Sequence, residues 1–246
     1  MAFKDHFTKQ SDGYAKYRPD YPDGLFEFLA SVSPSKELAW DCATGNGQAA
    51  NGLAKYFAKV IASDGSEKQI KNAAQNEKII YKVFPAEKVE IKSSTVDLIT
   101  VAQALHWFNF DKFYLEAKRI LKEGGVIAAW MYDLIRVSPE IDLITKKFDK
   151  EILVKYWPAE RRLYYDHYES IPFPFKKLNA PEFEMTAEWT LENLLGFLST
   201  WSAVQKYKER ENSDPLDLIR NDLLKAWDNE KSRKVNWELI LKIGIV

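Results

Sequence analysis

The sequence predicts an α/β fold in which a doubly wound, mostly parallel sheet carries helices on both faces. Three observations predict it: strand-like and helix-like segments alternate up to residue 132, the strand-like segments are short apolar runs, and a glycine turn follows the first of them. Nearly continuous apolar runs are typical of parallel strands buried on both faces. We expect a seven-stranded sheet, with five strands in the first half and two closing strands in the second.

The first half of the chain alternates regularly between helix and strand. Pro22 and Asp23 are signals for a helix start, and Gly124 and Gly125 mark a helix end. The predicted helices are residues 22–32, 47–58, 66–75 and 110–121. The predicted strands are residues 38–41, 59–63, 79–84, 96–102 and 126–132.

The second half is rich in aromatic residues and largely helical. Helices are predicted at residues 134–148, 152–157, 191–207 and 214–227, and the closing strands at 183–189 and 237–246. We expect one domain over residues 1–246, with a core at about 35–132 plus the C-terminal strands. An α-helical cap, at about 133–180 and 191–230, is expected to be inserted in the C-terminal half and to cover the site.

Composition excludes several classes of protein. The net charge of −1 gives no indication of a nucleic-acid partner, and no apolar run approaches the length of a membrane span. The single cysteine, Cys42, excludes an internal disulfide and a CxxC zinc site. Because the N-terminus lacks an apolar signal core, we expect a cytoplasmic protein. We also expect a small-molecule substrate and no metal.

The segment ELAWDCATGNGQ, residues 37–48, is the most informative part of the chain. A strand that ends in an acid, a small-residue turn and a helix start together build a nucleotide-sized site, because glycines admit a ligand close to the backbone. A carboxylate at Asp41 would repel a diphosphate and attract a cationic amino-acid group. Gly45-x-Gly47-x-x-Ala50 also satisfies the dinucleotide fingerprint, so that alternative stays open.

Asp64 ends the second predicted strand. An acid at that place can accept hydrogen bonds from both ribose hydroxyls of a nucleoside. The alternative is that Asp64 caps the following helix, for which Ser66 is also a candidate.

Several short stretches carry a resemblance to one family. They are YAKYRPDYP (14–22), DCATGNGQAA (41–50), VIASDGS (60–66), Ala86-Glu87, DLITVAQALHWF (97–108), RILKEGGVIAAW (119–130) and TWSAV (200–204). With them the chain resembles the class I S-adenosylmethionine-dependent methyltransferases, and within these the branch of trans-aconitate methyltransferase-like proteins. The resemblance implies the Rossmann-like methyltransferase fold. It is dense up to residue 130 and sparse beyond.

The resemblance implies S-adenosylmethionine as the cofactor and gives its site residues. Asp41 and the backbone of the turn would face the methionine part, and Asp64 and Gly65 would hold the ribose. Ala86 and Glu87 would border the adenine. Ala102 and Gln103 would lie beside the sulfonium end. The residues of the turn are Ala43, Thr44, Gly45, Asn46 and Gly47. The family has a glycine where this chain has Ala43, and alanine is tolerated there if its φ is negative, as we expect.

Substrate contacts are expected from three other segments. His106 follows the fourth strand and would be a substrate contact or general base. The alternative is that it only donates to a loop carbonyl group. Trp107 would form a pocket wall. Tyr14, Tyr17 and Arg18 would form an N-terminal flap in which Arg18 binds a carboxylate, or a packed surface turn. Trp201 and Ser202 would close the pocket from the cap.

Arg161 and Arg162 lie in the aromatic segment at residues 156–175. If they faced inward, the substrate would be anionic. Since charged runs in a cap are more often solvated, we expect both side chains in water.

The predicted function is methyl transfer from S-adenosylmethionine to a small molecule, with a carboxylate oxygen as the first choice of acceptor. A carboxylate is ionised near neutral pH and needs no strong base. Two alternatives remain. A nicotinamide-dependent oxidoreductase would need room for a diphosphate and a Tyr-x-x-x-Lys pair, which the chain lacks. A non-catalytic cofactor-binding protein is the other.

Overall fold

The central part of the molecule is a parallel sheet of five strands, seen in a computed structural model that describes residues 17–246. Tyr14 therefore lies outside the described residues. The order β3-β2-β1-β4-β5 reverses direction between β1 and β4, which makes the sheet doubly wound. The strands are β1 (Leu38–Cys42), β2 (Lys59–Asp64), β3 (Ile79–Val83), β4 (Val96–Ala102) and β5 (Leu121–Tyr132).

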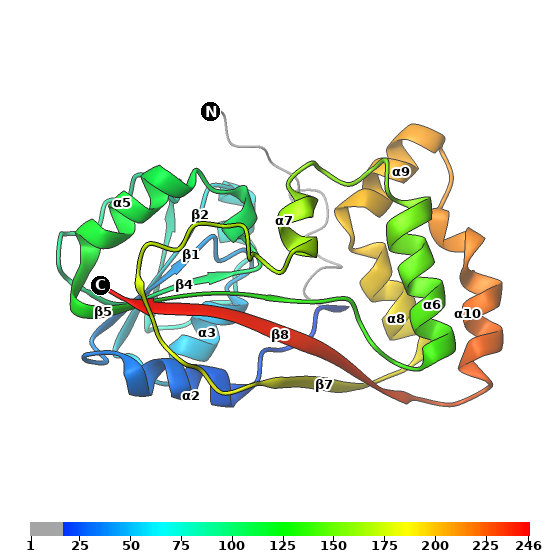
Figure 1. Ribbon diagram of the computed structural model, residues 1–246, viewed down its shortest axis with the longest axis horizontal. Helices are drawn as coiled ribbons and strands as arrows, with labels where there is room; N and C mark the ends of the chain where they lie inside the picture. Colours follow the sequence, from blue (N-terminus) through cyan, green and yellow to red (C-terminus); the bar gives the residue numbers. More distant parts are fainter. Residues whose placement is uncertain (1–16) are drawn as a thin grey trace.

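Antiparallel strands extend the sheet beyond β5, and here the prediction of seven strands is wrong. In the described residues the sheet has eight strands, because β8 (Arg233–Ile245) pairs with β5, with the short β6 (Lys176–Lys177) and with β7 (Glu184–Trp189). The parallel majority is five of the eight. β8 is 13 residues long, so one end completes the core while the other reaches the cap (Figure 1).

Both faces of the parallel sheet are covered by helices. Along β5, alternate residues point to opposite faces: Val126, Ala128 and Trp130 join the cluster beneath α2 (Asp23–Val32) and α3 (Gln48–Leu53). Ile127, Ala129 and Met131 join the cluster beneath α5 (Phe110–Ile120). A fourth helix, α4 (Glu67–Lys71), is capped by Ser66, whose hydroxyl oxygen accepts from the Gln69 N–H.

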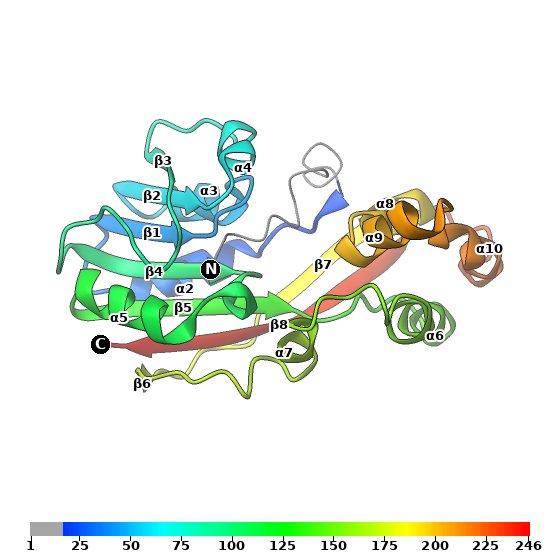
Figure 2. The same ribbon diagram turned by 90° about the horizontal axis from the view of Figure 1, so that it is seen from above.

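The second half supplies a group of helices at the end of the sheet toward which the parallel strands point (Figure 2). This group, here called the cap, consists of α6 (Pro139–Lys147), α8 (Leu191–Ser199), α9 (Ser202–Glu211) and α10 (Arg220–Trp227). It packs with β7 and β8 around its own apolar cluster. The helix predicted at 191–207 is two helices, since the chain turns at Thr200 and Trp201. The short α7 (Arg161–Tyr165) stands between cap and sheet.

The expected cap at 133–180 extends too far at its C-terminal boundary. After α7 the chain turns back, and Ile171 and Phe175 pack in the cluster on the α5 face of the sheet. The end of α6 also departs from regular geometry, because a π-helical turn, η3 (Phe148–Ile152), follows it directly. Single π turns inside α-helices are frequent at functional sites.

Candidate functional site

The glycine turn after β1 is fixed from below by Asp41. This carboxyl group is completely buried and accepts hydrogen bonds from the hydroxyls of Thr44 and Thr100. Burial raises its pKa to about 6. The structure therefore places Asp41 beneath the turn, where its hydrogen bonds connect the turn to β4.

Asp64 connects this turn to the end of β2. Its carboxylate accepts hydrogen bonds from the N–H groups of Gly45 (3.0 Å) and Ser66 (2.8 Å). Because the Ser66 hydroxyl caps α4, the alternative that Asp64 is merely the cap is not supported. Gly45 has φ +57°, and a side chain built on it would meet nothing within 4 Å, so the backbone is open to a ligand beside Asp64.

Two other turn residues have defined surroundings. Gly47 has φ +84°, a backbone conformation that favours glycine, and a Cβ there would also lie 2.5 Å from the Tyr81 hydroxyl. Ala43 contradicts our expectation of a negative φ, because its φ is +56°. This left-handed conformation is unfavourable for alanine by about 1–2 kcal/mol, and it places strain at the tip of β1.

The residues predicted to border the adenine and the sulfonium follow β3 and β4. Ala86 is largely buried, and the Glu87 carboxylate accepts from the Asn109 N–H at 2.9 Å, at the start of α5. Gln103, directly after Ala102, has φ +58°, and its buried Nε2 has no hydrogen-bond partner among residues 17–246. An unpaired buried donor is unfavourable in water-free surroundings, so Nε2 is available for a ligand.

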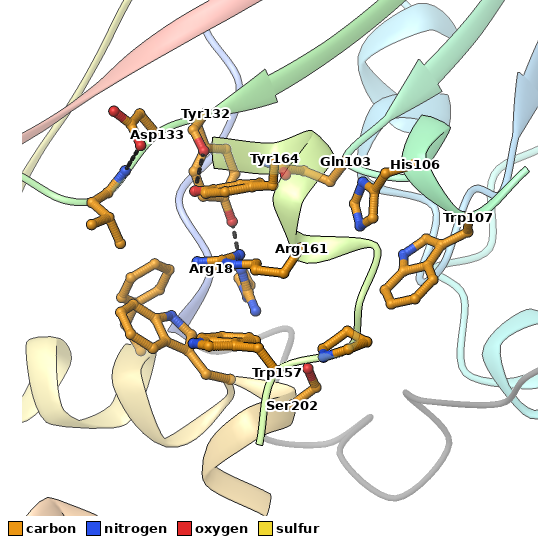
Figure 3. A pocket seen from close by; sticks show the side chains of 14 residues that line it. Arg18, Gln103, His106, Trp107, Tyr132, Asp133, Trp157, Arg161, Tyr164 and Ser202 are labelled. Carbon is orange, nitrogen blue, oxygen red and sulfur yellow. Dashed lines mark hydrogen bonds between the residues drawn. The ribbon is translucent and has the colours of Figure 1, made fainter. Parts of the chain in front are cut away.

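A cavity of about 90 Å³ lies between the end of the sheet, α7 and the cap (Figure 3). One water molecule needs roughly 10–15 Å³ on the same scale, so the cavity suits a small molecule. It brings together residues that are far apart in the sequence. They include Arg18, Gln103, His106, Trp107, Arg161 and Trp201.

Arg161 contradicts our expectation of solvated arginines, whereas Arg162 is exposed as expected. The Arg161 guanidinium lies 4.0 Å from the Trp157 ring centroid and 3.8 Å from that of Tyr164. Aromatic faces attract cations, and these two rings desolvate the group without repelling it. The inward position depends on these contacts, which the charge pattern at residues 161–162 does not indicate.

Asp149, which the sequence did not indicate, holds one edge of Arg161. Its fully buried carboxylate lies 3.2 Å from Arg161 Nη2 and accepts from the Tyr165 hydroxyl at 2.9 Å. The π turn η3 brings Asp149 to this position. Arg161 Nε is buried and has no hydrogen-bond partner in the described part of the chain.

Arg18 enters the cavity from the N-terminal side. Its Nη1 donates to the Tyr132 hydroxyl at 2.7 Å, and its guanidinium lies 5.2 Å from the Phe197 ring centroid. Tyr132 also accepts, through its carbonyl oxygen, from the Tyr164 hydroxyl at 2.7 Å. Arg18 and Arg161 therefore line one cavity, and both side chains point into it (Figure 3).

His106 lines the same cavity in an uncharged form. Burial, with a smaller contribution from the Arg161 charge, lowers its pKa to about 3. Its Nδ1 lies 2.8 Å from the Tyr168 hydroxyl, and its ring centroid lies 4.7 Å from that of Trp107. A ring with so low a pKa is a weak proton acceptor, which argues against a general base and for a substrate contact.

Residues 17–246 offer neither a metal site nor a membrane-spanning helix. No group of three or more His, Cys, Asp and Glu side chains there is arranged to hold a metal ion. No helix in that range has the length and apolar composition needed to cross a bilayer.

Comparisons with known proteins agree on one family. A family model described as a methyltransferase domain matches residues 40–129. A protein of Dictyostelium discoideum named as a methyltransferase is 37% identical over 92% of this chain and 87% of its own length. A solved structure from Anaeromyxobacter dehalogenans, described as a type II methyltransferase, has a TM-score of 0.87 and 39% identity over 93% of this chain and 98% of that one.

The name of a more distant relative includes the methyl donor. A protein of Saccharomyces cerevisiae, named as an S-adenosylmethionine-dependent methyltransferase, is 26% identical over 77% of this chain and 62% of its own length. The chain belongs to the S-adenosylmethionine-dependent methyltransferases. It is an enzyme with S-adenosylmethionine as its cofactor, and the nicotinamide alternative has no support.

Proposed function

We propose that this enzyme transfers a methyl group to a carboxylate oxygen of a small organic acid, and that it stands in the branch similar to trans-aconitate methyltransferase. The observation that carries the proposal is that Arg18 and Arg161 line one small cavity beside Gln103 and His106. When bound, S-adenosylmethionine would supply a methyl group on a sulfonium: an O–C bond would form between the carboxylate and the methyl carbon as the C–S bond breaks, giving a methyl ester and S-adenosylhomocysteine.

The residues after β1, β2 and β4 fit the cofactor. Gly45 offers an open backbone beside Asp64, and a carboxylate has about four acceptor sites, which suits a pair of ribose hydroxyls. We assign Asp64 and Gly65 to the ribose. The turn is assigned to the methionine part, and Asp41 acts on that part through the turn. Ala86 and Glu87 are assigned to the adenine, and Ala102 and Gln103 to the sulfonium end.

The cavity suits an anion because most of the groups directed into it are donors. A guanidinium matches a carboxylate with two parallel N–H donors. Gln103 Nε2 adds a buried donor, and Arg161 keeps a buried Nε without a partner among residues 17–246. The Asp133 carboxylate, which also borders the cavity, accepts from the Leu134 N–H at 2.7 Å and lies 3.4 Å from His167 Nε2.

A carboxylate acceptor also fits the weak basicity of His106. The acid is ionised at neutral pH, and the low pKa of His106 keeps that ring neutral. The enzyme's own task is then to orient the acceptor and exclude water. Alignment alone can contribute on the order of 7–11 kcal/mol, and Trp157 and Trp201 from the cap side form apolar walls that keep water out.

The test is methyl transfer to a panel of small carboxylic acids, amines and phenols, with the variant Arg161→Gln and the matched control Arg162→Gln. We expect turnover with acids, a rise in KM for the acid of tenfold or more in Arg161→Gln, and no change in Arg162→Gln, whose side chain is exposed. Turnover confined to amines or phenols, or an unchanged KM in Arg161→Gln, would contradict the proposal.

A further inference from the structure

His106 and Tyr168 form a buried pair that joins two distant segments. His106 belongs to the 3-10 turn η2 (Leu105–Trp107) after β4, whereas Tyr168 follows α7. The Tyr168 side chain is completely buried, and its hydroxyl lies 2.8 Å from His106 Nδ1. Tyr168 does not line the cavity, so any effect that it has on a substrate passes through His106.

The chain adopts an unfavourable backbone to place Tyr168. His167 (φ +55°) and Tyr168 (φ +63°) are consecutive non-glycine residues in the left-handed region. The Lys242 ammonium holds this turn by donating to the carbonyl oxygens of Tyr168 and Ile171. Strained residues persist where surrounding structure fixes them, and they cluster at functional sites.

The surroundings of the pair decide which nitrogen of His106 carries the proton. The ring is neutral, so one nitrogen donates and the other accepts. Among the described residues, His106 Nδ1 is the hydrogen-bond partner of the completely buried Tyr168 hydroxyl, and a buried hydroxyl hydrogen needs an acceptor. The hydroxyl hydrogen is then directed to Nδ1, which accepts it, and the ring proton lies on Nε2. Nε2 is the nitrogen left for the cavity.

We propose that Tyr168 is a positioning residue that fixes His106 as the Nε2–H tautomer, so that His106 donates a hydrogen bond to an acceptor oxygen in the cavity. The identity of that oxygen as part of an acid rests on the proposed function. The relationship between Tyr168 and His106 does not. In this arrangement His106, Gln103 and Arg161 present donors to the same space.

Nitrogen-15 spectroscopy of labelled histidine rings tests the tautomer directly. The chain has three histidines, so His6→Gln and His167→Gln assign the His106 signals. We expect a protonated Nε2 and an unprotonated Nδ1 between pH 5.5 and 8. In Tyr168→Phe we expect a mixture of the two neutral tautomers, because the burial and the Arg161 charge that lower the pKa of His106 are both retained. The control Tyr156→Phe removes an exposed cap hydroxyl bound to Glu211 and leaves the pattern unchanged.

An Nδ1–H tautomer or an imidazolium in the unmodified protein overturns the proposal, as does an unchanged pattern in a folded Tyr168→Phe variant. The donor role is tested by adding succinate or benzoate with S-adenosylhomocysteine present. A downfield shift of the Nε2–H proton supports it. No shift with an acid that the enzyme methylates overturns it. If the enzyme methylates no acid while the tautomer is as expected, the proposed acceptor fails and the role of Tyr168 is retained.

Kinetics give a second readout that a general loss of structure would not imitate. We expect Tyr168→Phe to raise KM for the acid three- to tenfold and to leave the affinity for S-adenosylhomocysteine unchanged. Equal losses in acid and cofactor affinity would indicate a merely structural role and overturn the proposal.

Discussion

Ala43 and Gln103, which directly follow the neighbouring parallel strands β1 and β4, both have left-handed backbones, with φ of 56° and 58°. The strand order reverses between these two strands, and ligands of open α/β sheets bind at such a reversal. Two strained residues at this one place agree with a binding site. The strain is retained because the structure around the turn holds it.

Replacing Ala43 with glycine should stabilise the enzyme. Glycine relieves a left-handed strain of about 1–2 kcal/mol but loses about 0.4–1 kcal/mol through the greater freedom of the unfolded chain. We expect a net gain of roughly 0.5–1 kcal/mol in the free energy of unfolding, measured by urea denaturation. The control Ala226→Gly, inside α10, should lose a similar amount. A loss in Ala43→Gly would show that the strain is not relieved.

The parallel half of the sheet was predictable because its signal is local. The apolar runs of β1 to β5 and the glycine turn lie where the sequence indicates them, except that β5 begins at Leu121 and not at the predicted residue 126. The strand number was wrong because the length of β8 depends on what it pairs with. Residues 233–238 pair with β7 beside the cap, and residues 239–245 pair with β5, the last two of them also with β6. Only a partner several tens of residues away decides where such a strand begins.

Removing the Asp64 carboxylate should weaken cofactor binding. Asp64→Ala loses the two backbone bonds that hold Gly45 and Ser66, and with them the proposed ribose acceptor. Hydrogen bonds to an ionised acceptor contribute about 1.5–3 kcal/mol each, so we expect a drop in affinity for S-adenosylhomocysteine of a hundredfold or more, measured by isothermal titration. The exposed Asp23→Ala is the control. Unchanged affinity in Asp64→Ala would exclude the ribose role.

The acceptor end of the site was harder to predict than the cofactor end. Arg161 turns inward because Trp157 and Tyr164 pack on its faces and Asp149 balances its charge. Asp149 reaches it through a π turn, and helix periodicity gives no sign of such a turn. The inward position is therefore a property of packing between segments, which the local sequence pattern does not contain.

Neutralising Asp149 should affect the acid more than the cofactor. In Asp149→Asn the guanidinium of Arg161 loses its buried counter-ion, and breaking a buried pair destabilises a protein by up to about 3–5 kcal/mol. We expect a lower melting temperature, a five- to twentyfold higher KM for the acid, and unchanged affinity for S-adenosylhomocysteine. Glu151→Gln, an exposed neighbour in the same π turn, is the control. An unchanged KM would mean that Arg161 does not need Asp149 for its orientation.

Asp41 should make the enzyme less stable as the pH rises. Its pKa is about 6 in the fold and about 3.8 in the unfolded chain, so between these values the folded state binds more protons. Stability falls through that window by an amount on the order of 3 kcal/mol and stays low above it. Asp41→Asn removes this dependence. The stability of Asp41→Asn relative to the unmodified enzyme should therefore increase from pH 4 to pH 6, which is seen as a larger difference in the free energy of unfolding.

Asp97 supplies a control of opposite sign for the same measurement. Burial raises the pKa of Asp97. The Lys122 ammonium, the Leu38 N–H and the Ser35 hydroxyl together lower it by more than burial raises it, so the net shift is downward. Asp97 therefore stabilises the fold at pH values above its unfolded pKa, and that contribution is lost on acidification. Asp97→Asn should become less stable relative to the unmodified enzyme as the pH rises. If both asparagine variants changed with pH in the same direction, the assigned shift of Asp41 would be wrong.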